Sequence, residues 1–303
     1  MTTPSMTPPH QDIDHHFGSR IRQRILIMIK RYFQYQADLA ATERNMLCPE
    51  DCDAPGCQMA DVIVEVTLFD LIKLSLALNT PVSILFLNHC HFGFQSCELN
   101  RRYLSLLLKL EKPCHFLQKS RCKVQGFKPL NCVLFPEYHQ IIDFIPQLAK
   151  RPVFNRFPCL KSEIAVSNER SQALKKLKKM SKREEALSRY FLIGTPSFII
   201  DSKPLAKQLK RSILEIESFT VRDYDRLLKE ELKTTGLFDG IMDKVALLDT
   251  RQHMESFFSQ LEDKTLIRSL LEKMARPEIV FRLDGNRLKP TKRHLQRPEI
   301  IFM

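Results

Sequence analysis

Tryptophan is absent from this chain, and glycine is scarce. The 303 residues include no Trp and 8 Gly. Phosphate-binding loops and the turns of doubly wound α/β folds depend on glycine, and none of the motifs G-x-G-x-x-G, G-x-x-x-x-G-K-[ST] and G-x-S-x-G occurs. The composition therefore argues against nucleotide-binding α/β folds, and its many Leu, Lys, Arg and Glu residues favour a mainly helical protein with a small β element.

Long apolar segments are also missing. The apolar runs at 25–29 and 82–87 are far shorter than the roughly 20 residues that span a membrane as a helix. The stretch 1–16 is polar and rich in proline instead of resembling a signal peptide, so we expect a disordered tail there. We therefore expect a cytoplasmic protein without a transmembrane segment.

Cysteine is the residue that the chain concentrates. Six of its nine cysteines form two groups: Cys48, Cys52 and Cys57, then Cys114, Cys122 and Cys132. Short spacings allow one loop to direct several sulfur atoms at one point, as a metal ion or an iron–sulfur cluster requires. In a reducing cytoplasm, thiolate–metal bonding is favoured over a disulfide framework, and the odd number of cysteines agrees with this.

Hydrophobic periodicity predicts the elements around the first group. One amphipathic helix is predicted over 17–46, ahead of the first cysteine loop, and a strand is predicted at 62–66. Thr67, with Asp70 three residues later, is typical of a helix N-cap. A second short helix is expected over 82–89.

The second group lies in a segment that is predicted to be rich in strand. Within 103–124 we expect a hairpin that brings Cys114 and Cys122 together. A short helix is then expected to present Cys132, and helix continues over 137–149. Cys159 follows in a segment bounded by prolines.

The composition of the chain changes after Cys159, because no cysteine follows this residue. Helical patterns dominate 166–275, including a helix capped by Thr220 that ends at Gly236. We therefore predict a Cys-rich metal-binding domain at 47–160 and a helical C-terminal region at 161–303. That region contains a short repeat, RPEIVF at 276–281 and RPEIIF at 297–302, whose copies we expect to pair as antiparallel strands in a β hairpin.

The second cysteine group, PCHFL-x₄-C-x-V-x₄-PL-x-C-x₂-FP, resembles the core of the CxxCxxCC cysteine-cluster proteins, which are described as zinc- or iron-chelating domains. The resemblance covers about residues 47–160. It implies a first cysteine loop, a threonine-capped helix such as VTLFDLIKLSLAL, and then Cys114, Cys122, Cys132 and Cys159 in order. The chain departs from the family where Gln58 follows Cys57, because the first loop of the family ends in a Cys pair.

Seven thiols form the predicted metal-binding set: Cys48, Cys52, Cys57, Cys114, Cys122, Cys132 and Cys159. The expected cofactor is zinc or iron, including a [4Fe–4S] cluster, either of which takes about four thiolates. Cys90 and Cys97, beside His89 and His91, are interpreted as ordinary packing residues. His115 is a further candidate that would bind the metal or support a ligand.

Three functions remain open at this stage. The first is a cytoplasmic metal-binding protein, with a protein partner for the helical half. The second is a cluster-dependent protein-modifying enzyme, since flagellin lysine N-methylases carry a similar cysteine region, although no catalytic residue is assigned. The third is a nucleic-acid-associated protein that uses the net charge of +12. The basic run 174–183 is interpreted as a solvated helix face, because Leu174, Leu177 and Met180 form a helical apolar stripe within it.

Overall fold

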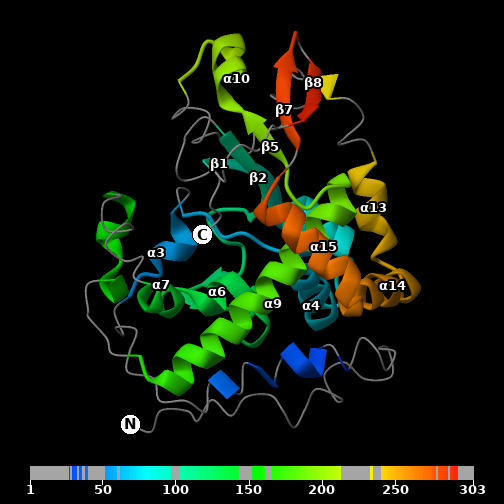
Figure 1. The fold of residues 1–303 in the computed structure, drawn as a ribbon. Coiled ribbons are helices and arrows are strands. Elements are labelled where there is room, and N and C mark those ends of the chain that lie inside the picture. Colours follow the sequence, from blue (N-terminus) through cyan, green and yellow to red (C-terminus); the bar gives the residue numbers. More distant parts are fainter. Residues whose placement is uncertain are drawn as a thin grey trace, which may run out of the picture.

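The structure is a computed structural model of the chain. It describes residues 27, 29–32, 34–35, 38–39, 52–59, 62–96, 103–142, 152–160, 166–212, 233–234, 240–277, 279–285 and 287–292. Within these ranges the protein is mainly helical with a small mixed sheet, which confirms the predicted fold class at that level (Figure 1). The predicted tail 1–16 lies outside the described residues, whereas those described between 27 and 39 are helical, in line with the helix predicted over 17–46.

A six-stranded sheet combines strands from both halves of the chain, in the order β1–β2–β5–β7–β8–β6. Its strands are β1 Cys90–Ser96, β2 Tyr103–Leu110, β5 Ile199–Asp201, β6 Lys233–Thr234, β7 Ile279–Asp284 and β8 Arg287–Lys292. Every residue of β2 is buried, so both faces of this strand are covered. β2 pairs with β5, so the sheet joins the part of the chain before Cys159, the last cysteine, to the part after it. One apolar core likewise includes residues from both parts.

Helices α4 (Leu68–Leu78) and α5 (Val82–His89) form where the sequence predicted them. The Thr67 hydroxyl accepts a hydrogen bond from the Asp70 amide at 3.0 Å, and Asp70 Oδ2 accepts one from the Thr67 amide at 3.1 Å. This capping box satisfies two backbone donors at the start of α4. The segment predicted as a strand at 62–66 is extended, but it joins β2 only through a bridge between Glu65 and Lys109.

A two-stranded hairpin and two short helices follow β2. The hairpin consists of β3 (Leu117–Gln118) and β4 (Arg121–Cys122), and its register pairs Leu117 with Cys122. Helix α6 (Leu130–Leu134) carries Cys132, as predicted, and α7 (Glu137–Ile141) follows it. Short 3₁₀ turns occupy η2 Gln125–Phe127, η3 Pro152–Arg156 and η4 Pro158–Leu160.

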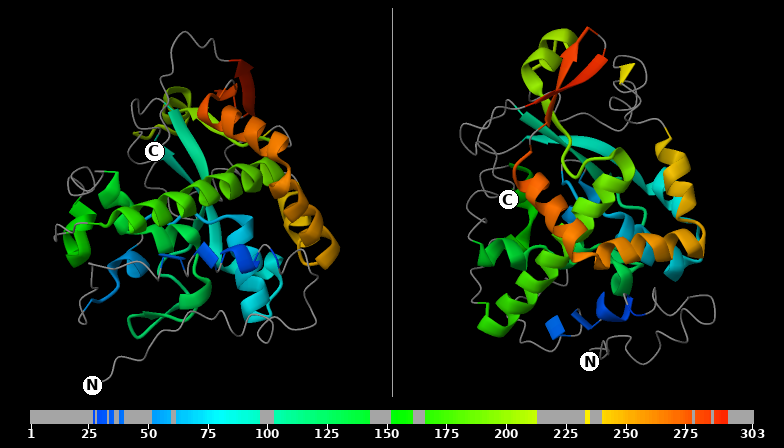
Figure 2. Two further views of the ribbon diagram at one scale, coloured as in Figure 1. Left: turned by 60° about the horizontal axis from the view of Figure 1, so that its bottom comes forward. Right: turned by 45° about the vertical axis from the view of Figure 1, so that its right-hand side comes forward.

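The long helix α9 (Asn168–Ile193) contacts six other helices, α4, α6, α7 and three of the C-terminal region (Figures 1 and 2). This segment is one uninterrupted helix of 26 residues. Its N-terminal half holds α7 through Arg170 Nη2, 2.6 Å from Glu137 Oε2. Its C-terminal half contacts the helices of the C-terminal region: α13 Ile241–Leu247, α14 Arg251–Glu262 and α15 Lys264–Ala275.

The second copy of the C-terminal repeat, 297–302, lies outside the described residues, so its predicted pairing stays a prediction. The first copy overlaps β7, which lies between β5 and β8 in the sheet. A tight turn at Gly285, with φ of 58°, closes the β7–β8 hairpin. Such a short connection needs much less loop-closure entropy than a return across the longer segment.

Helix α10 (Ser202–Leu209) follows β5 and ends with Lys210 in the left-handed conformation. The helix predicted to end at Gly236 falls mostly outside the described residues. Its described pair, Lys233 and Thr234, forms strand β6 instead.

None of the helices in the described ranges has by itself the length and apolar content to cross a membrane. Within these ranges, only α4 and α5 taken together have that length and apolar content, and these two helices are bent by 111° at the break between them.

Glu184 of α9 is a carboxyl group buried in the centre of this fold. Its side chain is 1% exposed, and Oε2 lies 3.4 Å from the Thr67 hydroxyl. Burial, followed by the nearby Asp70 carboxylate, raises the pKa of Glu184 well above its ordinary value. The group is therefore neutral in the folded protein under conditions where it ionises in the unfolded chain.

This proton uptake makes stability depend on pH. The unfolded carboxyl loses its proton as the pH rises through about 4.5, whereas the folded one keeps it, so the unfolding free energy falls with rising pH up to the folded pKa. Replacing Glu184 with Gln should remove about 1.4 kcal/mol per pH unit from this slope at pH values above the unfolded pKa and below the folded one. Urea unfolding followed by circular dichroism measures it. Glu169→Gln, an exposed position on the same helix, should leave the slope unchanged, and equal slopes in both variants would contradict the assignment.

Candidate functional site

The first cysteine loop is fixed against the turn that follows β2. Cys57 lies on the short helix α3 (Pro55–Gln58), which begins after Ala54 in the left-handed conformation. The Cys114 amide donates to the Cys57 carbonyl at 2.8 Å. The Lys112 ammonium also donates to the Gly56 carbonyl. Two separate parts of the sequence are thus joined at the point where each carries a thiol.

The Cys57 and Cys114 thiols interact with each other. This interaction is the main cause that lowers the pKa of Cys114 and raises that of Cys57. Physically, the Cys57 thiol donates and stabilises the Cys114 thiolate. The pair therefore favours a state with one proton and one negative charge, which is suited to a cation.

Two further cysteines surround this pair. Burial raises the pKa of Cys132, on α6, to about 12, and Cys132 also interacts electrostatically with Cys57 and Cys114. Burial likewise raises the pKa of Cys122, on β4, which interacts with Cys114. Four of the seven predicted ligands therefore lie within electrostatic range around Cys114, and they come from four different local structures.

The distances in this group are not those of a closed metal site. Among the residues that the structure describes, no three Cys, His, Asp or Glu side chains are arranged so that they hold a metal ion. Cys57 and Cys114 interact with each other through their side chains, whereas Cys122 and Cys132 interact with this pair electrostatically. The donor set thus fits zinc or iron by its chemistry, since soft thiolates favour both, while its geometry is open.

The remaining predicted ligands lie beside this group or outside the described residues. Cys159, on η4, is buried in a small apolar cluster with Val62 and Phe157. This cluster abuts α3, because a Cβ at Gly56 would lie 3.2 Å from the Phe157 ring. Cys52 is half-buried in the first loop, and Cys48 lies outside the described part of the chain.

The other polar candidates have structural surroundings. Cys90, at the start of β1, packs against the main core, and burial raises its pKa. His115 Nε2 lies 3.2 Å from Glu111 Oε2, and its ring lies 4.8 Å from that of His89. Cys97 is not among the described residues.

Asp70 positions the helix that carries Cys132. Its Oδ1 accepts a hydrogen bond from the Leu130 amide, in the first turn of α6, at 3.1 Å. The same oxygen lies 2.9 Å from Lys73 Nζ, and both side chains are about 1% exposed. The Lys73 ammonium also lies 3.4 Å from the centroid of the Tyr32 ring, and the Tyr32 hydroxyl donates to the Lys128 carbonyl at 2.8 Å. Asp70 thus connects α4 directly to the cysteine-bearing segment.

Two lysines near the thiols were not selected from the sequence. The positive charges of Lys112 and Lys128 lower the pKa of Cys132, because they favour its thiolate form. Lys112 also lowers the pKa values of Cys57 and Cys114 for the same reason. Their positions beside Pro113 and Pro129 were visible in the sequence, but only the fold brings them to the same thiols.

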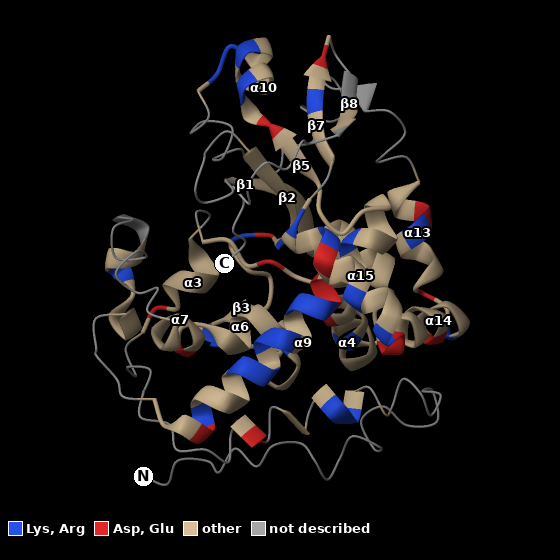
Figure 3. Cartoon of the chain, in the orientation of Figure 1, with Lys and Arg blue, Asp and Glu red and all other residues tan. Residues whose placement is uncertain are grey.

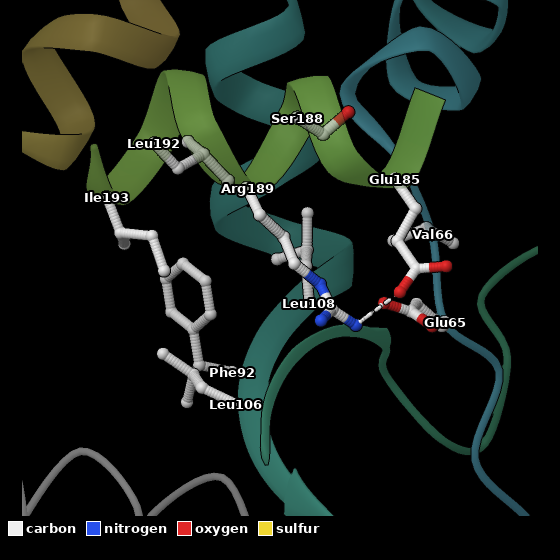
Figure 4. A pocket seen from close by; sticks show the side chains of 10 residues that line it. All are labelled: Glu65, Val66, Phe92, Leu106, Leu108, Glu185, Ser188, Arg189, Leu192 and Ile193. Carbon is white, nitrogen blue, oxygen red and sulfur yellow. Dashed lines mark hydrogen bonds and ion pairs between the residues drawn. The ribbon is translucent and has the colours of Figure 1, made fainter. Parts of the chain in front are cut away.

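A separate pocket lies between α9 and the sheet. Figure 4 shows the Arg189 side chain reaching toward Glu65 and Glu185, and its Nη2 lies 2.6 Å from an oxygen of each. Apolar residues such as Phe92 and Leu106 line the other side. The cavity volume is about 10 Å³, which is room for about one water molecule. The pocket therefore does not accommodate a substrate.

Comparison with known proteins adds no relative: no family model, curated protein or solved structure matches this chain. The resemblance to the CxxCxxCC proteins therefore rests on the motif alone and stays a prediction.

Removal of the Asp70 charge tests its positioning role. Asp70→Asn leaves the buried Lys73 ammonium without its counter-ion, and breaking a buried ion pair in this way typically costs about 3–5 kcal/mol of unfolding free energy. Urea denaturation should detect a loss of this size. The double variant Asp70→Asn/Lys73→Met should regain part of it, because no buried charge remains.

Asp243→Asn is the matched control, since Asp243 is exposed in the first turn of α13. It should cost less than about 1 kcal/mol. An Asp70→Asn protein as stable as the control would contradict the role of this ion pair.

Proposed function

We propose that this protein binds zinc or an iron–sulfur cluster through cysteine thiolates, with Cys57, Cys114, Cys122 and Cys132 as the ligands. The observation that carries the proposal is that three of these thiols, Cys57, Cys122 and Cys132, each interact with the fourth, Cys114. A buried apolar thiol has no need of other thiols nearby, whereas a structural zinc ion or a [4Fe–4S] cluster takes four thiolates.

The surroundings support thiolate ligation. Each bound thiol loses its proton, and the negative charge that results must be offset. Lys112 and Lys128 supply two positive charges close to the sulfurs. The interaction between the Cys57 and Cys114 thiols already keeps one of them in a form that favours ionisation.

The other predicted ligands belong to the proposal as well. Cys48, Cys52 and Cys159 are candidates for a second centre, and the segment of Cys159 packs against α3. We further propose a reducing, cytoplasmic location, where these cysteines remain thiols. When bound, the metal would hold α3, the β3–β4 hairpin and α6 together through their thiolates.

Metal analysis tests the proposal. The full chain, purified without oxygen, should carry stoichiometric zinc, or iron with acid-labile sulfide and a broad absorption band near 400 nm. Cys114→Ser and Cys122→Ser should each lose most of this metal, because every ligand of a four-thiolate site is required.

Cys90→Ala is the matched control, because Cys90 packs against the core and no other cysteine among the described residues contributes to the shift of its pKa, and it should keep the metal. A folded wild-type protein without metal, or equal metal loss in all three variants, would overturn the proposal.

A second candidate function is supported by the exposed face of α9. Lys175, Lys176 and Lys179 are exposed, and within the described residues none of them takes part in an ion pair. Figure 3 shows basic residues recurring along this helix. Lysines without counter-ions on one helix face suit the phosphate backbone of a nucleic acid.

Fluorescence anisotropy with labelled duplex DNA and single-stranded RNA tests this second function. Reversing the charge of Lys175, Lys176 and Lys179 to Glu should weaken binding by about tenfold or more in low salt and reduce its salt dependence. The same reversal at Lys203, Lys207 and Lys210 of the α10 region is the control with equal net charge. Equal weakening in both variants would indicate a general charge effect and contradict a specific surface on α9.

A further inference from the structure

Cys57 and Cys114 are held together by the backbone as well as by their thiols. The Cys114 amide donates to the Cys57 carbonyl at 2.8 Å, and Lys112 donates to the neighbouring Gly56 carbonyl. The side chains also interact with each other, and this interaction is the main influence on the pKa of both thiols.

This arrangement satisfies the requirements of a disulfide. The 2.8 Å hydrogen bond from the Cys114 amide to the Cys57 carbonyl, on helix α3, brings the two backbones into direct contact. A disulfide requires Cα atoms about 4.4–6.8 Å apart and side chains that point toward each other. The interaction between the two thiols agrees with the second condition.

We propose that, in the metal-free protein, Cys57 and Cys114 close a reversible disulfide that blocks metal binding. The consequence for metal rests on the proposed function, whereas the disulfide itself does not. Closing the bond removes two of the four proposed thiolate ligands at once. Bound metal, in turn, occupies both sulfurs and protects them from oxidation.

The oxidant is a low-molecular-weight disulfide. One protein thiolate attacks a sulfur of this molecule, which forms a mixed disulfide and releases one small thiol. The second protein thiol, after losing its proton to solvent, attacks the sulfur of the first cysteine and releases the other small thiol. Two electrons pass from the cysteine pair to the small disulfide, which is reduced to two thiols.

The surroundings favour this pair over other combinations. Cys57 is half-buried, so a small molecule has access to the pair, although Cys114 is only 8% exposed. Cys159 is buried among apolar side chains, and Cys90 packs against the core on β1. Cys122 and Cys132 interact with Cys114 only electrostatically.

Mass spectrometry of the full chain tests the proposal. Metal is removed with a chelator under reducing conditions, and the protein is then exposed to excess glutathione disulfide and alkylated. The wild-type protein should lose the mass of two hydrogen atoms, and a peptide cross-linked between Cys57 and Cys114 should be found. Dithiothreitol should reverse both changes. Protein preloaded with zinc should form this cross-link at least about tenfold more slowly.

Variants and metal binding separate this inference from the proposed function. Cys57→Ser and Cys114→Ser should not form the intramolecular bond, whereas Cys90→Ala should form it at the wild-type rate. Oxidised wild-type protein should lose its zinc-binding capacity and regain it after reduction. A wild-type cross-link between other cysteines, or none, would overturn the inference even if the reduced protein binds zinc. A Cys57–Cys114 bond in a protein that never binds metal would overturn the proposed function alone.

Discussion

The Asp70 carboxylate is the group on which the arrangement of the N-terminal half depends. One oxygen completes the capping box at the start of α4, and the other accepts a hydrogen bond from the first turn of α6 and pairs with the buried Lys73 ammonium. Buried charges of this kind are stabilising only when both partners are present. The start of α4 and the start of α6 are consequently fixed to each other, and α6 carries Cys132.

The thiol group follows from this framework. Cys132 is held by α6, Cys122 by the β3–β4 hairpin, and Cys57 by the hydrogen bond between its carbonyl and the Cys114 amide. Each thiol therefore has a rigid local support, but the four supports meet only in the folded chain. A bound metal would link the same segments a second time, and a Cys57–Cys114 disulfide would link two of them in its absence. These two cross-links exclude each other because they use the same sulfur atoms.

Local features of the sequence predicted the local elements well. The Thr67–Asp70 spacing predicted the capped helix, and the strand-rich pattern of 103–124 predicted a hairpin that includes Cys122, because both depend on neighbouring residues. The contact of Cys57 with Cys114 depends on long-range packing, which spacing does not encode. Lys73 would be expected on a solvent-exposed helix face, yet it is buried because Asp70 and the Tyr32 ring compensate its charge. The partner of β7 was missed because a turn at Gly285 closes a much shorter hairpin than the repeat implied.

X-ray absorption at the metal edge of the anaerobically purified full chain tests the central claim most directly, because it identifies the atoms bound to the metal. Thiolate ligation predicts a first shell of about four sulfur atoms, near 2.3 Å if the metal is zinc. A first shell made only of nitrogen and oxygen atoms near 2.0 Å would contradict the claim that these cysteines form the metal site.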